Sequence, residues 1–258
     1  MSFLEINLYS DVLRMNMDVN MVLPAGNSKI KTVWLLHGGH GDHNDWVRKT
    51  HCVRIAETAG IALIMPNVHY SCYVDMKNGL PYARYLGEEL PVKMRAMFTR
   101  LSEKREDNYI SGFSNGGYGS LRMGLLYPEV FGFVGAFAAG DHDSLEFVND
   151  GSKVAKNRIA LFGPEPDIHE TSYSVKYLAA QLLKTDRPRP VIWHACGEFD
   201  PWYKGNRRNR RFFEGLEGDP FSYRYKEYPG MGHTAECREQ AFTDFVKARF
   251  LGTKVGDL

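Results

Sequence analysis

A serine lies at the centre of GFSNG, residues 112–116, with a glycine two positions before it and another two positions after it. The stretch follows a short apolar segment, 109–111, and precedes a segment with helical character. This context is typical of a nucleophile elbow, a strand-to-helix turn so tight that larger flanking side chains would clash. Gly117 and Gly119 follow, where a helix must pack closely against a sheet. The sequence predicts Ser114 as a nucleophile; the alternative is a glycine-rich turn with a surface serine.

A serine hydroxyl needs a neighbouring base, and that base needs an acid to orient it. At a nucleophile elbow the expected chain order is serine, acid, histidine. His233 ends PGMGH, a glycine-rich stretch between an expected strand and the last expected helix. His194 falls inside an apolar segment and is expected in the core, whereas His142 and His169 precede the acid candidates. We therefore predict His233 as the base.

The acid is expected just beyond a strand end, between the serine and the histidine. Segment 190–195 is an apolar strand candidate, and CGEFD follows it. We select Asp200 because Pro201 follows it in a turn that can fix the carboxylate towards the histidine; Glu198 is the second candidate. A solvated loop charge is the alternative for either carboxylate.

Acyl transfer also needs donors for a tetrahedral oxyanion. One expected donor is the backbone N–H of Asn115, which directly follows the nucleophile. The other is expected from the loop after an early strand, where HGGHG occupies residues 37–41. Glycine lets the backbone of that loop approach a substrate carbonyl, and we predict the N–H of Gly39 as the second donor.

The same loop gathers histidine and aspartate side chains, which raises a metal site as an alternative. These residues are His37, His40, Asp42, His43 and Asp45. Their spacing does not match the ligand patterns of zinc sites, and an oxyanion loop explains the glycines better. We predict no metal and no cofactor.

Three aromatic residues near the motifs are candidates for lining an acyl or alcohol pocket: Trp46, Phe113 and Trp202. Such side chains more often belong to a hydrophobic core, so both interpretations stay open.

The elements that would position these groups alternate along the chain. Residues 3–10 and 15–23 alternate apolar and polar side chains, as half-buried antiparallel strands do. Short apolar runs typical of doubly buried strands follow at 32–36, 61–65, 109–111, 133–138 and 190–195, with another strand expected at 222–228. Helices are expected at 51–59, 86–101, 117–127, 174–184, 206–216 and 237–250. This order predicts an α/β fold: a mostly parallel sheet with antiparallel N-terminal strands and helices on both faces.

We expect one domain over residues 1–258. The segment at about 140–189 is rich in turn residues and is interpreted as a cap-like insertion over the carboxyl edge of the sheet, the edge where ligands bind.

Composition excludes several classes of function. The chain of 258 residues has 32 Lys and Arg against 31 Asp and Glu, a net charge of +1 that argues against nucleic-acid or membrane-surface binding. The basic cluster at 207–211 precedes apolar residues at helical spacing and is interpreted as the outer face of an amphipathic helix.

No apolar run is long enough to cross a bilayer, and the N-terminal residues do not resemble a signal peptide. The four cysteines form no CxxC spacing, and we expect a cytoplasmic protein with buried thiols.

Longer motifs carry a resemblance to a known family. LLHGGHGDHNDW, GFSNGGYGSLRMGLLYPEVFGFVGAFAAG, ACGEFDPWY and PGMGHTAECREQAFTDF occur in the order and spacing of the esterase D and S-formylglutathione hydrolase-like group. Within that group the chain most resembles the bacterial tributyrin esterases. The resemblance covers nearly the whole chain. It implies an α/β-hydrolase fold, cofactor-free carboxylesterase activity on short acyl chains, and a triad of Ser114, Asp200 and His233.

The chain departs from this family at two places. Gly39 stands where the family usually has Leu or Met, and Thr234-Ala235 follow the histidine where an Asp or aromatic residue is common. Both departures affect the expected substrate, not the expected reaction.

The leading prediction is a serine carboxylesterase that acts on a small-molecule, short-chain ester. Alternatives are an S-formylglutathione hydrolase, an acetyl or feruloyl sugar esterase, and a non-catalytic binding module that keeps the fold. A homo-oligomer is possible.

Overall fold

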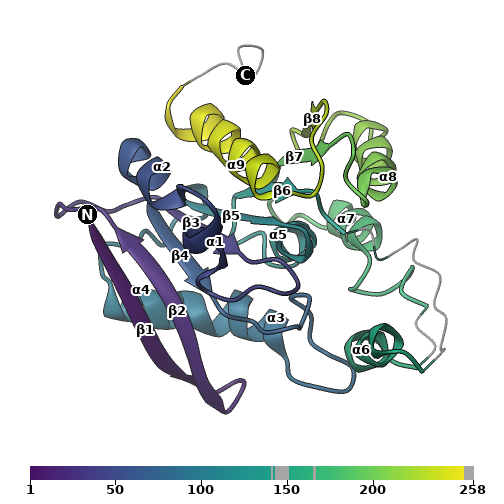
Figure 1. Cartoon of the computed structure of the whole chain (residues 1–258), viewed down its shortest axis with the longest axis horizontal. Helices are drawn as coiled ribbons and strands as arrows, with labels where there is room; N and C mark the ends of the chain where they lie inside the picture. The colour runs from purple at the N-terminus through teal and green to yellow at the C-terminus, as the bar shows by residue number, and fades with distance from the viewer. Residues whose placement is uncertain (141, 143–150, 165–166, 253–258) are drawn as a thin grey trace.

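A single eight-stranded sheet forms the centre of the computed structural model, which describes all residues except 141, 143–150, 165–166 and 253–258 (Figure 1). The strand order is β1-β2-β4-β3-β5-β6-β7-β8. The strands are β1 (Ser2–Ser10), β2 (Met15–Leu23), β3 (Thr32–Leu36), β4 (Ala62–Pro66), β5 (Asn108–Phe113), β6 (Phe133–Phe137), β7 (Val191–Gly197) and β8 (Arg224–Tyr228). Strands β1 and β2 are antiparallel to their neighbours and the remaining pairs are parallel, which confirms the predicted sheet.

Helices cover both faces of this sheet, as predicted (Figure 1). They are α1 (Asp45–Lys49), α2 (Cys52–Ala59), α3 (Tyr82–Arg84), α4 (Leu90–Met97), α5 (Asn115–Leu126), α6 (Lys153–Phe162), α7 (Val175–Leu183), α8 (Tyr203–Glu214) and α9 (Ala235–Phe250). Side chains of α1, α2 and α9 join one apolar cluster, and those of α4, α5, α7 and α8 join the other.

The central strands supply both clusters by alternation. In β3, Val33 and Leu35 enter the cluster under α9, whereas Trp34 and Leu36 enter the cluster under α5. Successive side chains of a strand point to opposite faces, so a strand covered on both sides must be apolar throughout. All five residues of β3 are buried, which accounts for the uninterrupted apolar run in its sequence.

The helix expected at 86–101 is shorter and irregular, and that prediction was wrong in its bounds. A π-helical turn, η1 (Tyr85–Glu89), precedes α4, and the Leu90 N–H donates to the Tyr85 carbonyl five residues back. Pro91 interrupts the regular ladder there because it has no N–H to donate. The helix ends at Met97, and Leu101 instead forms a bridge with Ile30.

The stretch at 140–189 contains more helix than its turn-rich sequence indicates. Besides the expected α7, it holds α6, whose first turn is capped by the Ser152 hydroxyl accepting from the Ala155 N–H. The stretch leaves the carboxyl end of β6 and returns to the start of β7, and part of it lies outside the described residues. No helix among the described residues is both long enough and apolar enough to span a membrane.

Candidate active site

Ser114 lies at the junction of β5 and α5, where the sequence places the elbow. Its backbone has φ 61° and ψ −123°, a conformation that non-glycine residues rarely adopt. Its N–H donates to the Phe137 carbonyl at 2.9 Å. Strain of this kind at a candidate nucleophile is typical of functional sites.

The flanking glycines are required by close backbone contacts. A Cβ at Gly112 would lie 2.5 Å from the Gly116 carbonyl oxygen, and a Cβ at Gly116 would lie 2.4 Å from the Leu36 carbonyl oxygen. Gly117 packs on the backbone of β6, as expected, but Gly119 faces the Tyr73 ring and not the sheet. Close packing therefore requires glycine at 112, 116 and 117, as the elbow prediction states, whereas Gly119 packs against Tyr73 and not against the sheet.

Asp200 and His233 meet across the ends of two loops. The Asp200 Oδ2 accepts a hydrogen bond from His233 Nδ1 at 2.7 Å, and its Oδ1 accepts from the Trp202 N–H at 2.8 Å. The carboxylate is fully buried, whereas 28% of the His233 side chain is exposed. A proton on Nδ1 leaves Nε2 with a free lone pair, the state that a general base requires.

Glu198, the second acid candidate, reaches the same loop by another route. It is exposed, and its Oε2 accepts from the Gly230 N–H at 2.9 Å. A Cβ at Gly197 would lie 2.4 Å from the Met231 carbonyl oxygen, so the end of β7 also packs directly against this loop. Glu198 thus contacts the backbone of the histidine loop, and Asp200 contacts the imidazole.

The histidine loop and the elbow are joined by an aromatic contact. The rings of Phe113 and His233 lie 4.5 Å apart between centroids. The buried Arg238 guanidinium lies 4.9 Å from the centre of the same Phe113 ring. The imidazole therefore rests beside the residue that immediately precedes Ser114.

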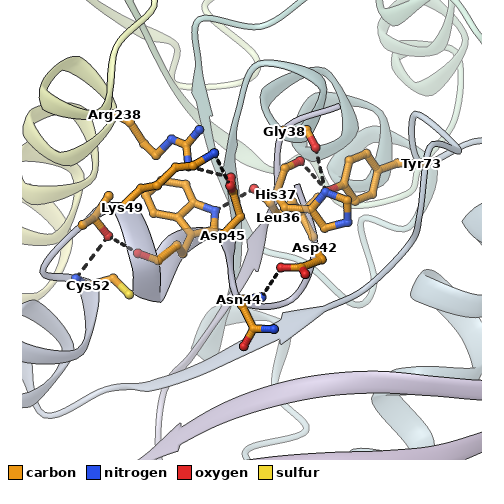
Figure 2. Close-up of polar contacts among 12 residues, drawn as sticks. Leu36, His37, Gly38, Asp42, Asn44, Asp45, Lys49, Cys52, Tyr73 and Arg238 are labelled. Carbon is orange, nitrogen blue, oxygen red and sulfur yellow. Dashed lines mark hydrogen bonds and ion pairs between the residues drawn. The ribbon is translucent and has the colours of Figure 1, made fainter. Parts of the chain in front are cut away.

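The loop after β3 lies against the elbow as well. A Cβ at Gly38 would lie 3.7 Å from the Ser114 Cβ. His37 braces this loop, because its Nδ1–H donates to the Gly38 carbonyl at 2.7 Å (Figure 2) and its Nε2 accepts from the Val68 N–H at 3.2 Å. The Tyr73 hydroxyl donates to the His37 carbonyl at 2.6 Å. Burial lowers the pKa of His37, which favours its neutral form.

Asp45 anchors the far side of that loop to α9. Its carboxylate binds Arg238 at 2.6 Å and Lys49 at 2.5 Å (Figure 2). Burial opposes ionisation of this carboxyl, but the bonds and charges of Lys49 and Arg238 outweigh that effect and lower its pKa. Asp42 caps the turn by accepting from the Asn44 N–H at 2.8 Å. Within the histidine- and aspartate-rich stretch, His37, Asp42 and Asp45 therefore each have a structural hydrogen-bond or ion-pair partner.

The aromatic pocket candidates occupy different positions. Trp46 and Phe113 are each 1% exposed, and the Trp46 indole donates to the Leu36 carbonyl at 2.8 Å. Of the two interpretations that the sequence allowed, both rings therefore belong to the hydrophobic core. Trp202 is half-buried at the start of α8. His194 lies in the core as expected: its Nε2–H donates to Asn206 at 2.6 Å, and burial lowers its pKa to about 4.

Sequence reasoning missed Arg238 and Tyr73 as supports of the site. Arg238 follows the histidine by five residues on α9, and a single sequence gives no sign that a cation there is buried. Tyr73 has a left-handed backbone, φ 60°, which only the folded loop requires.

The chain is similar to known esterases. The esterase family model matches residues 10–248. An acetyl esterase of Caldicellulosiruptor saccharolyticus is 28% identical over 252 residues, which cover 90% of this chain and 92% of that protein.

Two solved structures from Staphylococcus aureus are also similar. The fluorophosphonate-binding serine hydrolase FphF superposes with a TM-score of 0.84 at 26% identity, covering 96% of this chain and 98% of FphF. The S-formylglutathione hydrolase FrmB gives a TM-score of 0.79 at 25% identity, with the same coverage. The tributyrin esterase likeness within the group is not established by these relatives. The chain belongs to the esterase family, and it is a carboxylic ester hydrolase of the serine hydrolase type with an α/β-hydrolase fold.

Proposed function

We propose that Ser114, His233 and Asp200 form the catalytic triad of a serine carboxylesterase. The observation that carries this proposal is the 2.7 Å bond between Asp200 and His233, made beside a strained elbow serine. In this mechanism His233 Nε2 takes the proton of Ser114 as the hydroxyl attacks the ester carbonyl. His233 then gives that proton to the leaving alcohol, and an acyl-enzyme remains. Water, activated by the same imidazole, releases the acid.

We propose the backbone N–H groups of Gly39 and Asn115 as donors to the oxyanion. Asn115 is the first residue of α5, where unpaired N–H groups and the helix dipole favour negative charge. The bonds that His37 makes hold the loop carrying Gly39 rigid, so these donors need little rearrangement during the reaction.

Labelling with a fluorophosphonate probe, followed by a panel of acyl esters and thioesters, tests this function. Stoichiometric labelling with ester cleavage supports the carboxylesterase. Preference for S-formylglutathione over every oxygen ester would favour the second candidate, which the similarity to FrmB supports. Absence of labelling would favour a binding module without catalysis.

We propose small, neutral esters with short acyl chains as the substrates. Within the described part of 140–189, Val154 is the only large apolar side chain that is exposed. The described part of 140–189 therefore does not form the broad apolar lid that long-chain lipases have.

Acetyl to butyryl esters are expected to be cleaved with higher kcat/KM than decanoyl or longer esters. A long chain gains roughly 0.8 kcal/mol for each methylene that is buried, but only where an apolar groove receives it. A series of p-nitrophenyl esters measures this directly. A rise in kcat/KM that continues past octanoyl would contradict the expectation.

Prolonged treatment with a chelator is expected to leave the esterase rate unchanged. The proposed chemistry uses the triad and backbone donors, and no group of three or more metal-ligating side chains capable of holding an ion occurs within the described ranges. The rate before and after dialysis against EDTA is the measurement. A loss that zinc, manganese or calcium restores would point back to His37, His40 and Asp42.

We also propose a cytoplasmic location and no nucleic-acid or membrane partner. All four cysteines are free and buried, as in reducing compartments. The basic face of α8 is the outer face of an amphipathic helix: Arg210 pairs with Glu214, and Phe213 is buried.

A further inference from the structure

A cavity of about 280 Å³ opens beside the oxyanion loop. It is lined by His69, Tyr70, Met76, Tyr82, Asn157 and Ala160, which come from the loop after β4, from α3 and from α6. The wall nearest the elbow is Tyr70, whose Cε2 would lie 3.5 Å from a Cβ at Gly39. None of the lining side chains is an aspartate, glutamate, lysine or arginine, so the cavity suits an uncharged group.

The Asn115 side chain, which directly follows Ser114 in the chain, meets this wall at Gly39. A Cβ at Gly39 would lie 2.6 Å from Asn115 Nδ2 and 3.3 Å from its Cγ. The amide therefore fills the space that any larger residue at position 39 would need. Its place is fixed by a hydrogen bond from Nδ2 to the Cys72 sulfur at 3.1 Å.

The loop that holds this amide has an unusual backbone and is tied to α5. His69, Cys72 and Tyr73 all have left-handed backbones, with φ between 49° and 60°. Burial raises the pKa of Cys72 to about 12, so its sulfur faces the amide as a neutral thiol. The Tyr73 carbonyl accepts from Arg122 at 2.6 Å, which ties the loop to α5.

His233 and the Tyr70 wall of the cavity lie next to different neighbours of Ser114. The imidazole packs on Phe113, the residue before Ser114, whereas Tyr70 and Gly39 lie beside Asn115, the residue after it. A leaving alcohol must face the histidine that protonates it. The acyl group, which stays bonded to the serine, therefore points away from the histidine.

We propose that this cavity is the acyl-binding site and that the Asn115 side chain forms its neck. The proposal rests on the proposed function and makes it more specific: the substrate carries an uncharged, unbranched acyl group of intermediate length at most. Gly39 is then needed for the neck, because a side chain there would displace the amide. Asn115 would act through its backbone on the oxyanion and through its side chain on acyl selectivity.

Two substitutions that change the cavity in opposite directions test the proposal. Ala160→Phe fills it and Met76→Ala enlarges it. The readout is the ratio of kcat/KM for hexanoyl and acetyl p-nitrophenyl esters. Each methylene buried in the cavity contributes roughly fourfold, so filling is expected to lower the ratio by about tenfold or more and enlargement to raise it. Val154→Phe makes a similar increase in size on an exposed part of α6 and is expected to leave the ratio unchanged.

The neck is tested with a branched acyl group. Asn115→Ala keeps the backbone N–H and removes the amide, and it is expected to raise cleavage of 2-methylpropanoyl relative to butanoyl esters by about fourfold, because the branching methyl group gains space. If the wild type cleaves esters but neither cavity variant moves the hexanoyl ratio, the acyl-site proposal is overturned and the proposed function stands. If the wild type neither cleaves esters nor reacts with a fluorophosphonate, both fail.

Discussion

Replacing Ser114 with alanine is expected to lower turnover of ester substrates by about 10⁴-fold or more, because loss of the nucleophile removes the covalent route. Folding is expected to be retained. The strained backbone at this position is held by the Ser114 N–H bond to Phe137, which alanine keeps. Turnover of p-nitrophenyl acetate and fluorophosphonate labelling, both lost in the variant, are the measurements.

Ser120, on the helix that follows Ser114, provides the control. The Ser120 hydroxyl is buried and donates to the Gly116 carbonyl at 2.7 Å, so Ser120→Ala removes a hydroxyl close to the elbow without touching the proposed nucleophile. It is expected to keep both labelling and turnover. Near-native rates in Ser114→Ala would show that the elbow assignment is wrong.

Asp200→Asn is expected to lower kcat by about 10⁴-fold with little change in KM, through the tautomer of His233. The asparagine amide can donate to Nδ1, where the aspartate accepts from it. The imidazole proton then moves to Nε2, which can no longer receive the proton of Ser114. Because the carboxylate is fully buried, no water can substitute for it.

Glu198→Gln is the matched comparison, since it makes the same chemical change two residues away. Its carbonyl oxygen can still accept from the Gly230 N–H, so the loop is expected to stay in place and activity to fall by no more than a few-fold. Steady-state kinetics on both variants separate the two acids. A larger loss in Glu198→Gln would exchange their roles.

The elbow and the parallel sheet could be predicted from sequence because both depend on local rules. Gly112 and Gly116 are required by contacts made within one turn and with the neighbouring strand. The doubly buried strands are readable because their residues are apolar without interruption.

Other features depend on contacts that no sequence window contains. The π-helical turn at 85–89 follows from Pro91 together with the fit of Gly87 against the Tyr127 ring, which comes from beyond β5. Trp46 is an aromatic residue of the kind that often lines a substrate pocket. It is buried in the core because α9 packs over its ring, which the sequence alone does not indicate. The sequence shows that Gly39 replaces the Leu or Met usual in the family. Only the structure shows that the Asn115 amide occupies the space next to this glycine.

The ion pair between Asp45 and Arg238 joins residues 193 positions apart and holds the oxyanion loop to the last helix. Contacts of such long range form late, since the intervening chain must first be ordered. On the ribosome the N-terminal strands can pair long before α9 has emerged. A nascent chain therefore holds its serine elbow without the histidine loop, and without the brace beneath the oxyanion loop, until residues 229–238 have been made. In the proposed mechanism, cleavage of esters begins only after that point.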